Sequence, residues 1–204
     1  MTSIALASDK LRTTQALTLT VEFNGFEHEI EFTKEDIETG DRDEWIAGQF
    51  AFMQSEHPDL DGEFLPEITD ATDFGGFYAS GGHLTRESLG FYVEIAASHY
   101  ALNMPMFIVI KRATRYGLEN FSSEYFVNSY RFHSADYDAI ADDFIEAIPS
   151  VATALKTFTT GVFGHDADLS SFCDMKALIE GICHAHNLSV IGKPSTGFYV
   201  FSDR

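Results

Sequence analysis

Several residues of types that bind metals lie near the C-terminus: His165, Asp166, Cys173, Cys183, His184 and His186. Thiolate and imidazole groups arranged tetrahedrally are the ligands that zinc prefers. On a helix, however, Cys183 and His184 point about 100° apart. Cys183 and His186 share a helix face, but it is the apolar one, and free cysteine is commonly buried. The simpler interpretation is a buried thiol beside a core histidine, so we expect no metal site.

Motifs for catalysis and cofactor binding are absent. No GxGxxG or GxxxxGK[ST] sequence is present, and the short segment 161–164 lacks the lysine of a phosphate loop. No GxSxG nucleophile motif occurs. His28 is alone on an apolar strand face, and His99, which could titrate near neutral pH, has no nucleophile beside it in sequence. We expect no catalytic residue, no cofactor and no enzymatic activity; the alternative is a small-molecule or metal-dependent enzyme of unrecognised type.

Negative charge is concentrated in one segment, residues 22–73, which we call the acidic block. It contains 17 Asp or Glu and two bases, a net charge of −15 out of −19 for the whole chain. A folded surface of this charge repels nucleic acid and acidic membranes and attracts basic surfaces. The clustered bases Lys111, Arg112 and Arg115, beside Tyr116, would reach one or two phosphates at most, so direct nucleic-acid binding is disfavoured.

The acidic block begins on a predicted β-hairpin over residues 17–32. Asn24 and Gly25 form the strongest short hairpin signal, because both tolerate positive φ. The two-residue turn predicts the pairs Leu17–Phe32, Leu19–Ile30, Val21–His28 and Phe23–Phe26 on one face, with Thr18–Glu31, Thr20–Glu29 and Glu22–Glu27 on the other. Side chains on one strand face repeat every 6.6 to 6.8 Å or so. The four glutamates would imitate a row of phosphates or, alternatively, keep an exposed sheet edge soluble.

The remaining elements follow from apolar periodicity. Asp41 and Glu44 predict the start of a helix that ends before Pro58, with the apolar stripe Trp45, Ile46, Phe50, Phe52 and Met53. Residues 59–82 read as strand and turn. Thr85 caps a helix over 86–101 that is apolar nearly all round and therefore central. Residues 106–111 predict a buried strand, and residues 121–133 are ambiguous, with aromatic content favouring a strand.

Towards the C-terminus, Ser134 or Asp136 caps a helix that ends before Pro149. Another helix is predicted over 169–186, followed by a hairpin that pairs 188–191 with 198–201. Strands do not alternate regularly with helices, so the fold class is α+β with an antiparallel sheet. Two cysteines, no signal-peptide pattern and no apolar run of about 20 residues indicate a cytoplasmic protein.

Residues 50–148 resemble the ArdB/KlcA antirestriction proteins of plasmids and other mobile elements. The matching pieces are residues 50–53, residues 59–62 with Phe64, the turn Gly75, Gly76, Phe77 and Tyr78, residues 89–102, residues 125–133, and the pairs 139–140 and 144–145. The resemblance implies that residues 121–133 are helical. It also divides the chain into a domain of residues 1–160, with the antirestriction-like core at 41–150, and a C-terminal extension of residues 161–204.

The resemblance implies an anti-defence function, inhibition of a bacterial type I restriction-modification enzyme through protein–protein contact. In a plasmid or phage setting, an acidic face that mimics DNA would occupy a basic surface of that enzyme. The residues expected to form this face are Glu22, Glu27, Glu29, Glu31, Asp41, Asp43, Asp59, Asp61 and Glu63. The expected partner is therefore a restriction enzyme or another DNA-binding defence protein. A generic acidic interaction module is the remaining alternative.

Overall fold

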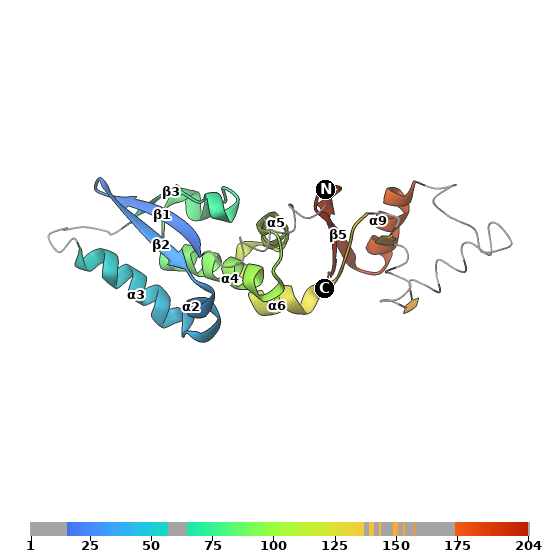
Figure 1. The fold of residues 1–204 in the computed structure, drawn as a ribbon, viewed down its shortest axis with the longest axis horizontal. Helices are drawn as coiled ribbons and strands as arrows, with labels where there is room; N and C mark the ends of the chain where they lie inside the picture. The colour runs from blue at the N-terminus through green and yellow to red at the C-terminus, as the bar shows by residue number, and fades with distance from the viewer. Residues whose placement is uncertain are drawn as a thin grey trace, which may run out of the picture. The chain divides into compact units, whose positions relative to one another are not determined.

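The computed structural model describes residues 16–56, 65–136, 139–140, 143, 149–150, 153, 157 and 174–203. These residues form an α+β structure with two three-stranded antiparallel sheets, which confirms the predicted fold class (Figure 1). The chain divides into two compact units, Met1–Val127 and Asn128–Arg204. The division falls earlier than the expected boundary near residue 160, because a strand at Tyr130–Ser134 pairs with the C-terminal hairpin.

The first unit is built on the sheet β2-β1-β3. Strands β1 (Leu17–Phe23) and β2 (Phe26–Phe32) form the predicted hairpin, and every predicted pair is present in the register. Asn24 and Gly25 have φ of 50° and 82°, as a type I′ turn requires. Strand β3 (Glu67–Asp70) pairs antiparallel with the other edge of β1.

One face of this sheet is apolar and packs against helices. Leu19, Val21, Ile30 and Phe32 are at most 2% exposed. The ring of Phe32 lies 5.2 Å from that of Trp45 and 5.0 Å from that of Phe74. Helices α2 (Lys34–Thr39), which was not predicted, and α3 (Arg42–Ser55) follow the hairpin (Figure 1). The predicted α3 stripe is wrong at Phe52, which is 58% exposed, since at 100° per residue it points away from the buried Phe50 and Met53.

Helix α4 (Arg86–Leu102) is the buried helix that the sequence predicts, with Thr85 as its N-cap. Nine of its residues are buried, and Ala96 is 0% exposed. Tyr100 connects the helix to the sheet, because its hydroxyl accepts from the Leu17 amide at 3.2 Å and donates to the Phe32 carbonyl at 2.6 Å. The short 3₁₀ segments Thr72–Phe74 (η1) and Ala79–Gly82 (η2) precede α4.

The strand predicted over residues 106–111 is wrong, because Met106–Tyr116 is a helix, α5. Pro105 occupies the N-cap position, and Ile108, Val109, Arg112 and Ala113 are buried. That spacing is helical and outweighs the β-branched composition. A 3₁₀ segment, η3 (Leu118–Asn120), follows α5. The ambiguous segment is then part helix and part strand, α6 (Ser123–Ser129) and β4 (Tyr130–Ser134), so the all-helical reading is wrong for its second half.

The second unit contains the sheet β4-β6-β5. Strands β5 (Leu188–Lys193) and β6 (Gly197–Ser202) form the predicted C-terminal hairpin. Helix α9 (Met175–Ala185) begins later than predicted, because Asp174 is its N-cap and accepts from the Ala177 amide. Ile179 and Cys183 from α9 pack with Phe198 and Val200.

Only part of the helix predicted after residue 134 lies within the described residues. The Asp136 carboxylate accepts from the Ala139 amide at 2.8 Å, as a helix cap does, and Ile140 is buried. Pro149 was expected beyond the end of a helix but has helical backbone itself. Among the described residues, no helix is long and apolar enough to span a membrane.

Candidate interaction surface

The face of the β2-β1-β3 sheet opposite the apolar one carries carboxylates on all three strands. Glu22 on β1 lies between Glu27 on β2 and Glu67 on β3. Glu29 and Glu31 continue the row along β2 opposite threonines. We call this surface the acidic face; it consists of Glu22, Glu27, Glu29, Glu31 and Glu67, all exposed except the partly buried Glu22.

Most carboxylates of the acidic face are available to a partner. Within the described residues, no Lys or Arg forms an ion pair with any of the five; Lys34 pairs with Glu38 and Arg42 with Glu94 instead. Glu22 has one local role, since its Oε1 accepts from the Gly25 amide at 2.9 Å and supports the turn. Like charges this close repel one another, so their arrangement costs stability.

Sequence reasoning missed Glu67 as a member of this face. Apolar and polar residues alternate from Pro66 to Thr69, which is a strand signal, and in the structure Pro66 and Ile68 are buried whereas Glu67 and Thr69 are exposed. It does not reveal that the strand would pair with β1 and place Glu67 opposite Glu22, because that pairing joins segments about 45 residues apart in sequence.

Two further acids at the end of the sheet have structural roles. Asp70 Oδ1 accepts from the Thr72 amide at 2.8 Å and from its hydroxyl at 2.6 Å. These hydrogen bonds, the side-chain one foremost, lower the pKa of Asp70 below its ordinary value. Asp73 Oδ2 accepts from the Thr18 amide at 3.0 Å, so it continues the hydrogen bonding of β1 beyond β3.

The predicted surface residues Asp41 and Asp43 do not belong to the acidic face. Asp41 caps α3, where its carboxylate accepts from the amides of Asp43 and Glu44 at 3.0 and 3.2 Å. Helix α3 packs on the apolar side of the sheet through Trp45, so its start lies across the sheet from the glutamate row. Three other predicted members, Asp59, Asp61 and Glu63, lie outside the described residues.

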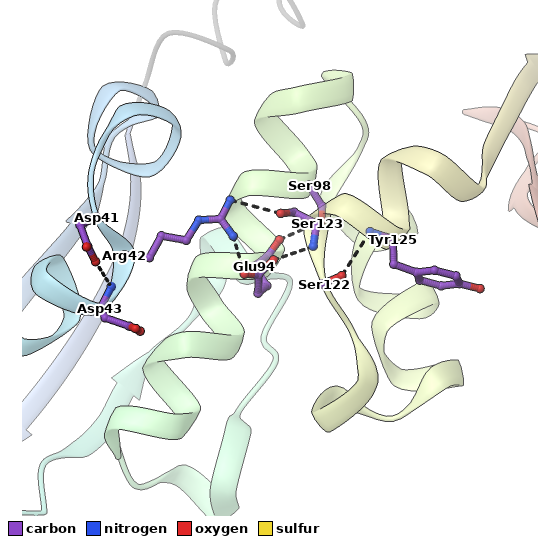
Figure 2. A network of polar contacts seen from close by, with 8 residues as sticks. All are labelled: Asp41, Arg42, Asp43, Glu94, Ser98, Ser122, Ser123 and Tyr125. Atoms are coloured by element: carbon purple, nitrogen blue, oxygen red, sulfur yellow. Dashed lines mark hydrogen bonds and ion pairs between the residues drawn. The ribbon is translucent and has the colours of Figure 1, made fainter.

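Figure 2 shows a polar network that joins three helices of the first unit. The Arg42 guanidinium on α3 pairs with Glu94 on α4 and donates to Ser123 Oγ on α6 at 3.2 Å. Glu94 also accepts from the Ser123 amide at 2.5 Å. The partly buried pair fixes α3 and α6 against α4. Arg42 and Lys34 are the two bases of the acidic block, and both are paired inside the first unit.

The turn of Gly75, Gly76, Phe77 and Tyr78 is held by backbone hydrogen bonds to residues 71–74 and by the hydroxyl of Tyr92. Gly75 and Gly76 have φ of 64° and 72°, a conformation that glycine adopts without strain. The Tyr92 hydroxyl donates to the Phe77 carbonyl at 2.7 Å and accepts from the Ala79 amide at 3.1 Å. Tyr78 is left 47% exposed beside this anchored turn.

The candidates for chemistry have ordinary structural environments. Burial raises the pKa of the Cys183 thiol to about 12, which disfavours the thiolate that zinc requires. The described residues include no group of three or more His, Cys, Asp or Glu able to hold a metal, and His165, Asp166 and Cys173 lie outside them. Absence of bound zinc stays a prediction, which elemental analysis of the purified protein checks.

Two other candidates, His99 and Arg112, also have structural environments. His99 is partly buried, which lowers its pKa, and its Nδ1 lies 2.7 Å from the Met104 carbonyl oxygen. Arg112 is 0% exposed, with its guanidinium carbon 4.2 Å from the centre of the Tyr116 ring. Of the suggested basic cluster, only Lys111 and Arg115 are therefore exposed, and Arg112 offers no charge at the surface.

Comparison with protein-family models, curated proteins and solved structures finds no match to this chain.

Proposed function

We propose that this protein is a non-catalytic inhibitor that binds the DNA-binding surface of a type I restriction-modification enzyme through its acidic face. The observation that carries the proposal is an ordered row of glutamates, all but Glu22 exposed, with no Lys or Arg ion-pair partner among the described residues. The class of target comes from the resemblance of residues 50–148 to the ArdB/KlcA proteins. The protein acts after a mobile element enters a bacterium.

The geometry of the acidic face suits a cationic protein surface. Its carboxylates repeat every 6.6 to 6.8 Å or so along a strand and every 4.7 to 4.9 Å or so between strands. A DNA-binding surface presents several Lys and Arg side chains on a similar scale to neutralise phosphates. The net charge of −15 in the acidic block steers such a surface towards the sheet and speeds association.

Plating of unmodified phage on a type I restricting host tests this function. The face variant replaces Glu22, Glu27, Glu29 and Glu31 with Gln. The matched control, the helix variant, replaces four exposed glutamates away from the acidic face: Glu35, Glu44, Glu56 and Glu87. Both changes take the net charge from −19 to −15, because each removes four negative charges.

Wild type and helix variant are expected to restore phage plating, whereas the face variant restores much less. Equal protection by both variants would show that the activity comes from overall charge or from the antirestriction-like core, residues 41–150, and not from the acidic face. Failure of the wild type against several type I systems would reject the proposed target.

A further inference from the structure

The two edges of the β2-β1-β3 sheet differ in how they are protected. The β3 edge is short, has a register shift against β1 and forms a bridge from Glu67 to His83. The Leu84 amide also donates to the Pro66 carbonyl at 2.7 Å there. Strand β2, by contrast, has seven residues in continuous register with β1 and, among the described residues, no strand on its other side.

The outward backbone groups of β2 belong to its glutamates. In a two-residue hairpin, the residues flanking the turn form a hydrogen-bonded pair, and hydrogen-bonded and non-hydrogen-bonded pairs then alternate. Phe26 and Phe23 are that first pair, so Glu27, Glu29 and Glu31 are in non-hydrogen-bonded positions. By the same alternation the Thr18 amide on β1 points away from β2, and it donates to the Asp73 carboxylate instead. The glutamate N–H and C=O groups therefore point away from β1 and form the free edge.

Apolar surface is exposed on the other face beside this edge. Phe26 at the start of β2 is 57% exposed. Phe52 on α3 is 58% exposed, and its ring lies 6.4 Å from that of His28, two residues along β2 from Phe26. A strand added to β2 would cover these rings with its inward side chains while its outward side chains lie opposite the glutamates.

We propose that β2 binds an extended segment of a basic partner protein as a fourth, antiparallel strand, with Lys or Arg alternating with apolar residues. Charge selects this occupant. A second copy of β2 would place glutamates beside glutamates, which is destabilising, whereas lysines would pair with them. Strand addition uses main-chain hydrogen bonds for affinity and alternate side chains for specificity. The inference specifies how the acidic face binds its target, and rests on the proposed function for the partner's identity.

A synthetic peptide of alternating lysine and valine, the length of β2 (7 residues), probes the edge directly. Directly opposite residues in a hydrogen-bonded antiparallel pair share a face. The lysines that face Glu27, Glu29 and Glu31 therefore also supply the backbone amides that donate to the carbonyl groups of these glutamates. Methylation of the lysine amide nitrogens should weaken binding about tenfold or more, because at least two hydrogen bonds are lost. Methylation of the valine amides, which point away, is the matched control and should preserve binding.

Peptide titration followed by fluorescence anisotropy measures both affinities on the unaltered protein. Equal affinity of the two methylated peptides would overturn the proposal, since it would mean that charge alone attracts the peptide. A protein-side comparison uses Glu29→Pro, which removes one outward amide, and Glu29→Gln, which removes only the charge. Glu29→Pro should weaken binding more, provided that its circular dichroism spectrum is unchanged.

The peptide and plating results separate the two proposals. If only methylation of the lysine amides lowers the affinity of the peptide, strand addition to β2 is supported even when phage plating shows no relief of restriction. Relief of restriction that depends on the acidic face, together with equal peptide affinities, would reject the edge strand and leave the proposed function standing.

Discussion

The two faces of the β2-β1-β3 sheet use the same strands for different purposes. One face buries Leu19, Val21, Ile30 and Phe32 almost completely, whereas the other presents glutamates to solvent. The second sheet, β4-β6-β5, shows that such acidity is not needed to build a three-stranded sheet, because its strands contain only Arg131 and Lys193 as charged residues. Stability and charge are therefore separable in the first unit, and substitutions on each side should have different consequences.

The largest effect is expected from a charge placed in the helices behind the apolar face. Ala96→Asp puts a carboxylate at a position with no exposed surface in α4. An unpaired buried charge is among the most destabilising changes, so we expect a loss of about 4 kcal/mol or more in the free energy of unfolding. Urea denaturation measures it, and an unchanged midpoint would show that α4 is peripheral.

Phe32→Ala tests the apolar face itself. The Phe32 ring is fully buried between Trp45 and Phe74, so its removal leaves a cavity. We expect a loss of about 3 to 5 kcal/mol. A loss below about 1 kcal/mol in the same denaturation experiment would mean that the hairpin contributes little to the core.

Tyr100→Phe keeps the ring and removes the hydroxyl that joins α4 to the hairpin. The Leu17 amide and the Phe32 carbonyl would each lose the partner that this hydroxyl provides. The cost of leaving such groups unsatisfied is about 1 to 3 kcal/mol. Hydrogen exchange at the Leu17 amide should also become faster, and unchanged exchange would contradict the bridging role.

The smallest effect on stability is expected on the acidic face. The face variant should unfold within about 0.5 kcal/mol of wild type, or be slightly more stable, because surface changes are usually small and like charges repel. Added salt should reduce any gain in the free energy of unfolding of the face variant over wild type, since salt screens the repulsion between the wild-type glutamates. A loss comparable to that of Phe32→Ala would show that the glutamates support the fold.

Local signals explain what could be predicted. Asn24 and Gly25, with strict alternation on either side, define the hairpin register completely. Thr85 and the continuous apolar surface of residues 86–102 likewise define α4. The strand prediction for residues 106–111 is wrong because their β-branched composition favours a strand. Pro105 at the N-cap and the helical spacing of the buried positions through Ala113 indicate the helix that forms. Composition is a weaker guide than spacing in so short a segment.

Features that depend on distant residues could not be predicted. The pairing of β3 with β1 places Glu67 on the acidic face, and the Arg42–Glu94 pair joins residues 52 positions apart. Neither leaves a periodic signal in the sequence. Asp41 shows the converse, because its local capping role was predicted correctly but its place relative to the sheet was not.

The most direct test of the central claim is the affinity of purified protein for a purified type I restriction enzyme, measured for wild type, face variant and helix variant. The account predicts a Kd at least about tenfold higher for the face variant than for wild type, and a much smaller increase for the helix variant, which loses only part of the steering charge. Wild-type affinity should also fall as salt increases, because the contact is largely electrostatic. A face variant that binds as tightly as wild type would contradict the account.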